Sequence, residues 1–146
     1  MSTRANIIIK DKEDQLIYYR HSDGYPSVTL PTLKKFMGWV KAKKIRDNVI
    51  QSAGWLVLIG AKEYEREYAG AGKWTVKPTI TEPLKDADDV QGWQAGSYEP
   101  TTEIHADIEW LYTLDLVKLT ITVQEVQGKG KYITVETVKD FTAKPE

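Results

Sequence analysis

The sequence predicts an α+β protein, a mostly antiparallel sheet covered on one face by two helices. The sheet is expected to combine an N-terminal hairpin with a C-terminal three-stranded meander. Two β-rich ends and a helical middle predict this class, because strands and helices that are segregated along the chain are typical of α+β folds. The 146 residues have the length of one domain. We therefore expect residues 1–146 to form a single domain, with a long irregular segment at about 70–102.

Two short runs of β-type residues predict the N-terminal hairpin. Ala5 to Lys10 contains three consecutive isoleucines, and Leu16 to Arg20 is aliphatic and aromatic. β-Branched and aromatic side chains are enriched in strands. The four polar residues 11–14 between the runs suit a short hairpin connection.

Apolar residues at three- and four-residue spacing predict the first helix. Pro31 is expected at its first position, where the missing N–H costs nothing. The apolar stripe then consists of Leu33, Phe36, Met37 and Val40.

A second helix is expected after Asp47, a residue type that is favoured at helix N-caps. The run Trp55 to Ile59 is apolar on all sides, so a buried strand is the alternative. Good helix formers follow at 61–67, which favours a helix, and Gly70-Ala71-Gly72 then ends it. Since Trp55 to Ile59 has no polar side, this helix is expected to be the more buried one.

Residues 70–102 are rich in glycine and proline and predict a long loop with one short strand from Trp74 to Ile80. Long loops in compact domains are uncommon and tend to be functional or mobile. The loop holds an acidic cluster of Asp86, Asp88 and Asp89. Its spacing is a poor match to a calcium loop, because the glycine comes one place late and no glutamate stands at position twelve.

Period-two alternation predicts the C-terminal meander. Ile104 to Leu114 alternates apolar and mostly polar residues, and Leu119 to Gln124 does the same. After a turn at Gly128–Gly130, Tyr132 to Val135 has high β-propensity. Three strands with short connections indicate antiparallel pairing.

Composition excludes several classes of protein. The chain has no cysteine, so it has neither disulfides nor thiolate metal sites. No apolar run is long enough for a membrane helix, and the N-terminus does not read as a secretory signal, so we expect a cytoplasmic protein without membrane contact. No phosphate-binding glycine loop, hydrolase elbow or zinc-protease motif occurs, and no cofactor is expected.

The charge is unevenly distributed, because residues 1–73 carry a net charge of +5 and residues 74–146 carry −6. A basic stretch in the first half could form a nucleic-acid-binding helix. The alternatives are a solvated helix face and attraction between the two halves of the chain. The stretch contains Lys34, Lys35, Lys41, Lys43, Lys44 and Arg46.

The segment from His21 to Tyr25 is a candidate binding site. It brings an imidazole, a hydroxyl, a carboxylate and a phenol to the end of a strand, and loops at strand ends often carry function. The alternative is an ordinary turn at Asp23-Gly24. Adjacent Ser and His do not make a catalytic triad, which needs a base in hydrogen-bond reach and a third orienting group.

A second candidate lies on the predicted strand from Ile104. Period two would place Glu103, His105, Asp107 and Glu109 on one side of it, where His105 and Asp107 could bind a divalent cation. The alternative is the solvated face of an antiparallel strand.

Three segments resemble a group of uncharacterised small proteins of phage and prophage genomes. These segments are Ser2 to Ile7, Tyr19 to Pro26 with the sequence YRHSDGYP, and Asp107 to Tyr112. The resemblance draws attention to Arg20, His21, Asp23 and Tyr25 as binding residues and implies no activity. The sequence departs from the pattern after Pro26, where Ser27-Val28 replaces an expected Glu-Gly.

The expected function is non-catalytic protein binding, with a host protein or a second copy of the chain as the partner. Five Trp and eight Tyr, together with the lack of catalytic motifs, favour this hypothesis. One alternative is a metal-assisted hydrolase or nuclease that uses His21, Asp23, His105 and Asp107. The other is nucleic-acid binding through the lysine-rich helix.

Overall fold

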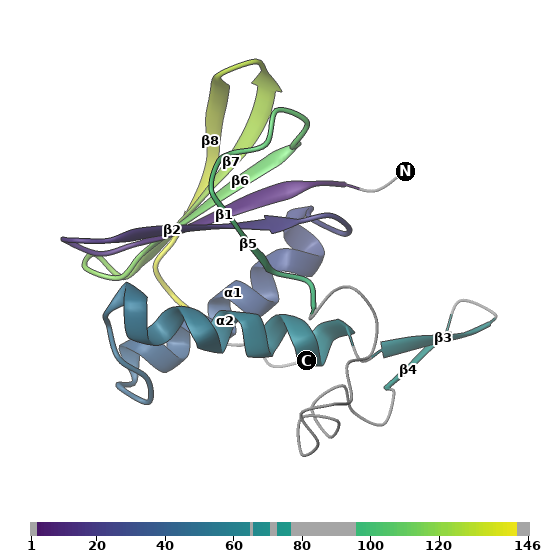
Figure 1. Ribbon diagram of the computed structural model, residues 1–146, viewed down its shortest axis with the longest axis horizontal. Coiled ribbons are helices and arrows are strands. Elements are labelled where there is room, and N and C mark those ends of the chain that lie inside the picture. The colour runs from purple at the N-terminus through teal and green to yellow at the C-terminus, as the bar shows by residue number, and fades with distance from the viewer. Residues whose placement is uncertain (1–2, 65, 71–72, 77–95, 143–146) are drawn as a thin grey trace.

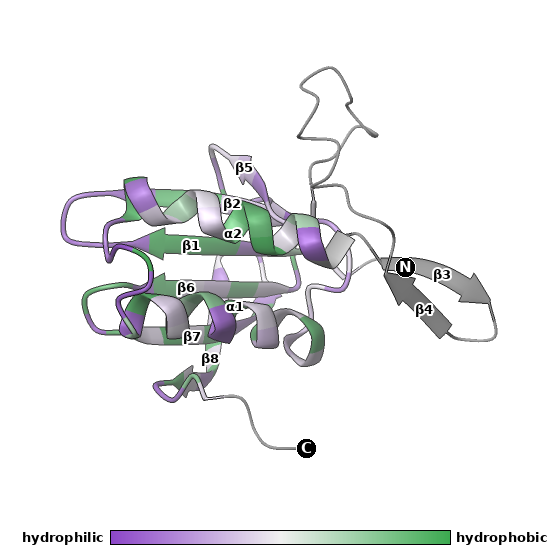
Figure 2. Ribbon diagram, turned by 90° about the horizontal axis from the view of Figure 1, so that it is seen from below, coloured by the Kyte–Doolittle hydropathy of each residue, from purple (hydrophilic) through white to green (hydrophobic). Residues whose placement is uncertain are grey.

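The structure is a computed structural model that describes residues 3–64, 66–70, 73–76 and 96–142. Its elements in chain order are β1 (Ala5–Lys10), β2 (Gln15–Arg20), α1 (Pro26–Lys41), α2 (Val49–Tyr64), β3 (Arg66–Gly70), β4 (Lys73–Val76), β5 (Glu99–Thr101), β6 (Trp110–Asp115), β7 (Thr120–Gly128) and β8 (Lys131–Val138). Both helices lie on the same face of the main sheet, α2 along β1 and β2 and α1 along β6 and β7 (Figures 1 and 2).

The main sheet has the strand order β5-β2-β1-β6-β7-β8. Strands β1 and β2 form the N-terminal hairpin, and β6, β7 and β8 form an antiparallel meander. The two parts join through the parallel pair β1–β6, in which Ala5 lies opposite Trp110 and Lys10 opposite Asp115. The predicted α+β class, the hairpin, the meander and the one-sided helical cover are all confirmed.

The core lies between the sheet and the helices. Ile7 and Ile9 of β1 are fully buried, as period two requires for the strand face that meets the helices. The predicted stripe of α1 is buried in the same core. Fully buried members of this core from the helices and the meander include Leu33, Phe36, Met37, Leu56, Tyr112, Leu114, Ile121 and Val123.

Helix α1 begins earlier than the sequence predicts. Tyr25 is the N-cap and Pro26 takes the first position, while Pro31 lies inside the helix. An internal proline removes one i to i−4 hydrogen bond and crowds a carbonyl of the preceding turn. The additional turn buries Thr29 and Leu30, which offsets that loss.

Helix α2 begins at Val49, and Asn48 rather than Asp47 caps it. The Oδ1 atom of Asn48 accepts a 2.9 Å hydrogen bond from the N–H of Ile50. Asp11, from the turn between β1 and β2, accepts the N–H of Val49 at 2.8 Å. The cap therefore comes partly from a residue 38 positions away, which local sequence does not reveal.

Residues Trp55 to Ile59 are helical, as predicted, but the expectation that this helix is the more buried one is wrong for its outer side. Ile50, Trp55 and Leu58 are exposed. In a two-layer fold the sheet covers one side of a helix, so an all-round apolar run leaves part of itself in solvent. The helix ends at Tyr64, and residues 66–67, expected to be helical, start β3, which pairs with β4.

The predicted strand from Ile104 to Leu114 is shorter than its alternation suggests, because β6 begins only at Trp110. Residues 102–109 instead cross the sheet face opposite the helices. The N–H of His105 donates to Oδ1 of Asn6 at 2.8 Å, and Ile108 is buried. Glu103, His105, Asp107 and Glu109 therefore do not share one strand face.

The segment predicted to be irregular contains β4, which starts at Lys73, and the short strand β5. The rest of the strand predicted from Trp74 to Ile80, beyond Val76, and the acidic cluster Asp86, Asp88 and Asp89 lie outside the described residues. None of the described helices has the length and apolar character needed to cross a membrane.

Candidate functional site

Arg20 anchors the turn after β2 from inside the protein. Only 2% of the residue is exposed. Its Nε–H donates to the carbonyl of Ser22 at 2.8 Å, and its guanidinium carbon lies 5.2 Å from the centroid of the Tyr98 ring. The cation is thus engaged by a backbone carbonyl and an aromatic face, so its role in a binding site is to hold the turn in place.

The following residues set the path into α1. Asp23 has a φ of 57°, and its carbonyl accepts the hydroxyl of Thr29 at 2.8 Å. The N–H of Gly24 donates to the carbonyl of Thr3 at 2.9 Å, which ties the turn to the N-terminal segment. Tyr25 then caps the helix with extended backbone and remains exposed. The predicted turn at Asp23-Gly24 is therefore present, with Asp23 and Tyr25 on its surface.

The structure brings the two histidines together around Tyr19, and we call Tyr19, His21 and His105 the Tyr–His cluster. The phenol oxygen of Tyr19 lies 3.0 Å from Nδ1 of His21. The Tyr19 ring stacks on the imidazole of His105, with centroids 4.0 Å apart and planes 12° apart. Because the His21 and Tyr19 centroids are 6.0 Å apart, the two imidazole centroids lie at most about 10 Å from each other.

An ion pair flanks the cluster. Arg4 Nη1 lies 2.9 Å from Oδ2 of Asp107, and both side chains are partly exposed. Partial burial raises the pKa of Tyr19, and the negative charge of Asp107 raises it further, while Arg4 opposes this effect. Tyr19 thus stays protonated at neutral pH, and its phenol oxygen is within hydrogen-bond distance of Nδ1 of His21.

This arrangement joins three segments named in the sequence analysis, which are Ser2 to Ile7, Tyr19 to Pro26 and Asp107 to Tyr112. Arg4 comes from the first, His21 from the second and Asp107 from the third. The backbone reinforces the contact, since the N–H of Glu109 donates to the carbonyl of Arg4 at 2.8 Å. Tyr19 and Arg4 were not among the residues singled out from the sequence, and the parallel pairing of β1 with β6 is what places them here.

A metal centre needs at least three converging ligands in most protein sites. Across the part of the chain that the structure describes, no three His, Asp or Glu side chains are grouped in a way that could hold an ion. In the predicted pair, His105 faces Tyr19 and Asp107 faces Arg4. These contacts account for the positions of both side chains without a bound metal ion.

The basic stretch divides into two groups. Lys35 extends over the ring of Trp39, with Nζ 5.6 Å from the centroid, and Lys34 lies beside it on α1. The other four cations line a pocket of about 570 Å³ between the α1–α2 connection and the turn that joins β6 to β7. These four are Lys41, Lys43, Lys44 and Arg46.

The outer strand β8 is a surface that the sequence analysis did not single out. Tyr132, Ile133 and Val135 are 37%, 51% and 50% exposed. The β7–β8 hairpin extends beyond the part of the sheet that the helices cover (Figure 1). The available signal was the run Tyr132 to Val135, in which apolar residues stand at neighbouring positions and so cannot all face one core.

Comparisons of the chain with protein-family models, with curated proteins and with solved structures give no match.

Proposed function

We propose that this chain is a non-catalytic protein-binding module that pairs through β8 with β8 of a second copy. The observation that carries the proposal is the open, apolar edge that β8 presents. Unpaired N–H and C=O groups on an edge strand are a template for another strand, and natural proteins usually block them.

The two edges of the sheet differ in this respect. The edge strand β5 has three residues, and Pro100 at its centre lacks the N–H that pairing would need. Strand β8 has eight residues and no proline, and in the described sheet it pairs with β7 alone. One edge is thus closed to further strands, and the other is open.

The composition of β8 adds an apolar contribution. Ile133 and Val135 are each about half exposed, next to the partly exposed ring of Tyr132. β-Branched and aromatic side chains form the more favourable cross-strand pairs. Burial of these three side chains against another strand would remove apolar surface from water.

The charges of β8 favour a second copy over an arbitrary strand. In an antiparallel pair centred on Ile133, with the additional residue Val135 left out of the pairing, Lys131 of each copy lies opposite Glu136 of the other. The same register puts Tyr132 opposite Thr134 and Ile133 opposite Ile133 of the other copy. Among the described residues neither Lys131 nor Glu136 forms an ion pair, so both charges are available.

One irregularity of β8 is compatible with this pairing. Val123 pairs with Glu136 and Gln124 with Thr134, so Val135 is an additional residue in β8. A bulge increases the local twist of an edge strand. In a two-fold symmetric pair each bulge lies between the pairs Thr134–Tyr132 and Glu136–Lys131, and it brings Glu136 to the same face of the sheet as Lys131.

The Tyr–His cluster supports a binding role over catalysis. A catalytic acid or base has a pKa tuned toward the working pH. The surroundings of Tyr19 move its pKa upward, away from neutrality. The phenol therefore ionises less readily than that of an ordinary tyrosine, and the cluster offers ring faces and hydrogen-bonding groups to a partner.

A charge-swap experiment tests the pairing. Lys131→Glu and Glu136→Lys each place like charges opposite each other twice per dimer, and each should weaken dimerisation about tenfold. The double variant restores opposite charges and should recover dimerisation. Sedimentation equilibrium over a range of protein concentrations measures the dissociation constant.

Lys129→Glu is the matched control, because it makes the same charge change in the turn outside the proposed pairs. Its dissociation constant should stay within about twofold of the wild type, since exposed charges contribute little. A wild-type chain that remains monomeric at all concentrations would falsify the proposal. Single variants that weaken the dimer without recovery in the double variant would exclude this register.

A further inference from the structure

We infer that the pocket between the α1–α2 connection and the β6–β7 turn binds an organic phosphate, a phosphate ester with an apolar or aromatic part. The pocket lies at the opposite end of β7 from the β7–β8 turn, so it is separate from the proposed dimer edge. Its volume of about 570 Å³ falls within the range of small-molecule sites.

The rim of the pocket carries excess positive charge. Lys41, Lys43, Lys44 and Arg46 line it together with one carboxylate, Asp47. The four cations form no ion pairs with described residues, although Lys41 also lies near enough to Asp140 to lower the pKa of that carboxyl. Lysine and arginine are the side chains that bind phosphate groups best.

The lysines are not needed to cap the end of α1. The carbonyls of Gly38, Trp39 and Val40 already accept backbone N–H groups of residues 42–44 at 2.9 to 3.1 Å. A lysine at a helix C-terminus can bond these carbonyls. Here backbone bonds satisfy them, which leaves the ammonium groups available for a ligand.

The wall of the pocket opposite the cations is apolar and held in place. Leu116, Val117 and Leu119, from the turn between β6 and β7, contribute to the lining, as do Val40 and Ile45. Val117 is half exposed, at 51%. An apolar wall beside four cations suits a ligand with a charged end and an apolar end, which inorganic phosphate lacks.

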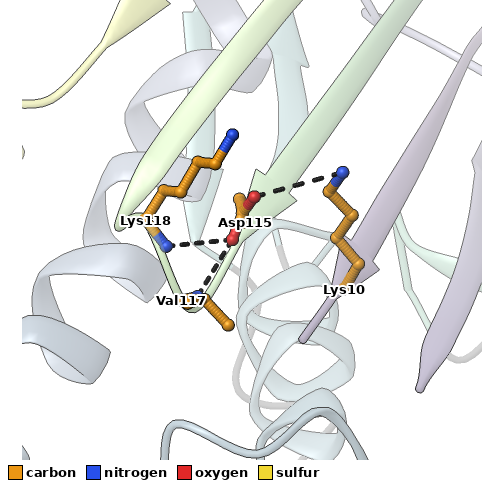
Figure 3. Close-up of polar contacts among 4 residues, drawn as sticks. All are labelled: Lys10, Asp115, Val117 and Lys118. Carbon is orange, nitrogen blue, oxygen red and sulfur yellow. Dashed lines mark hydrogen bonds and ion pairs between the residues drawn. The ribbon is translucent and has the colours of Figure 1, made fainter. Parts of the chain in front are cut away.

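Asp115 fixes this wall. Its Oδ1 atom accepts the N–H groups of Val117 and Lys118, each at 3.0 Å, and Oδ2 lies 4.0 Å from Nζ of Lys10 (Figure 3). The N–H of Leu116 also donates to the carbonyl of Lys10 at 2.9 Å. The turn is thus tied to the end of the parallel β1–β6 pair, where Lys10 lies opposite Asp115. The apolar wall is therefore already formed before a ligand binds.

The pocket favours a small phosphate ester over a nucleic-acid strand. Nucleic acid is usually tracked by an extended line of cations. Here Lys34 and Lys35 lie on α1 outside the lining, while the other four cations converge on one cavity.

Titration calorimetry of the full chain with ADP, phenyl phosphate, inorganic phosphate and a single-stranded oligonucleotide tests the inference. We expect both esters to bind, and inorganic phosphate to bind at least tenfold more weakly. Lys43→Gln/Lys44→Gln should weaken the esters about tenfold or more. Lys34→Gln/Lys35→Gln removes the same charge outside the pocket and should change their affinity less than twofold.

The apolar wall has its own test. Val117→Asn should weaken phenyl phosphate several-fold while leaving any binding of inorganic phosphate unchanged. The absence of ester binding would overturn the inference. Equal losses in the two lysine variants, or oligonucleotide binding tighter than that of ADP, would also overturn it in favour of a general polyanion surface.

Discussion

The phenol of Tyr112 donates a 2.6 Å hydrogen bond to the carbonyl of Gly24, which lies 88 positions earlier in the chain. Tyr112 is fully buried on β6, and Gly24 is buried in the turn before α1. The bond therefore joins the C-terminal meander to the turn that begins the helical layer. Burial raises the pKa of Tyr112, so the phenol stays protonated and remains a donor at neutral pH.

Tyr112→Phe should reduce the free energy of unfolding by about 1–3 kcal/mol, because the Gly24 carbonyl would remain buried without this donor. Urea denaturation monitored by tryptophan fluorescence measures the change. Tyr132→Phe is the matched control, since the Tyr132 phenol is partly exposed. It should change stability by less than about 0.5 kcal/mol, and equal effects of the two substitutions would contradict the proposed role of the bond.

Substitution by alanine should have opposite effects on stability at two glycines. A Cβ at Gly24 would lie 2.8 Å from Cβ of Ala5 and 2.9 Å from the carbonyl oxygen of Thr3, so Gly24→Ala should destabilise the protein by about 1–3 kcal/mol. A Cβ at Gly54, inside α2, meets no atom within 4 Å. Gly54→Ala should stabilise the protein by about 0.5–1 kcal/mol, because alanine loses less entropy in a helix.

Thermal denaturation of the two alanine variants gives a direct comparison. Changes of the same sign in both would show that the close approach of Gly24 to the N-terminal segment does not determine its effect. The contrast matters for the site, because the Gly24 turn holds the segment that carries His21.

Asn6 connects the hairpin to the segment that carries His105. It is fully buried, its amide donates to the carbonyl of Tyr18 at 2.9 Å, and its Oδ1 accepts the N–H of His105 at 2.8 Å. Asn6→Ala leaves both backbone groups without their side-chain partner and should cost about 2–4 kcal/mol. Native-state hydrogen exchange should show the largest loss of protection at the amide of His105.

Asn6→Asp serves as a comparison, because it retains an acceptor for His105 and removes the donor to Tyr18. It should preserve more of the His105 protection than Asn6→Ala does. Equal loss of protection in both variants would contradict the separate roles assigned to the two ends of the amide.

The sequence predicted the architecture wherever periodicity reports burial. The isoleucines of β1, the stripe of α1 and the alternation in β7 are local patterns, and each one marked its element. The prediction of the architecture failed where a residue distant in the sequence determines the local structure. Residues 102–109 alternate like a strand, yet hydrogen bonds to the side chain of Asn6 and to the carbonyl of Arg4 hold them as a crossing loop.

The same reason limits the prediction of the site. His21 and His105 were recognised by residue type, but the sequence did not show that both contact Tyr19, whose neighbours are set by the strand order of the sheet. Arg20 stood out in the sequence for a resemblance, and its burial against Tyr98 could not be deduced from adjacent residues. Local patterns thus identified chemical groups, and the parallel β1–β6 pair determined which of them meet.

The hydrogen bonds of the Asp11 carboxylate should make the folding stability of the protein depend on pH. Its carboxylate accepts the N–H of Val49 at the start of α2, and the N–H groups of Glu13 and Asp14 within its own turn. These bonds favour the charged form and hold the pKa of Asp11 below its ordinary value in the folded protein. Since the unfolded chain binds the proton more tightly, the stabilisation is fully present above about pH 4 and is lost as the pH falls through the folded-state pKa.

Asp11→Asn should therefore be less stable than the wild type at pH 7, and the difference between them should shrink between about pH 4 and pH 2. Urea denaturation at a series of pH values measures this difference. Asp140 also has a lowered pKa, through its bonds to Thr142, and remains in both proteins, so its contribution cancels in the comparison. A difference that stayed constant from pH 7 to pH 2 would show that the carboxylate charge does not stabilise the start of α2, and that the cap depends on Asn48 alone.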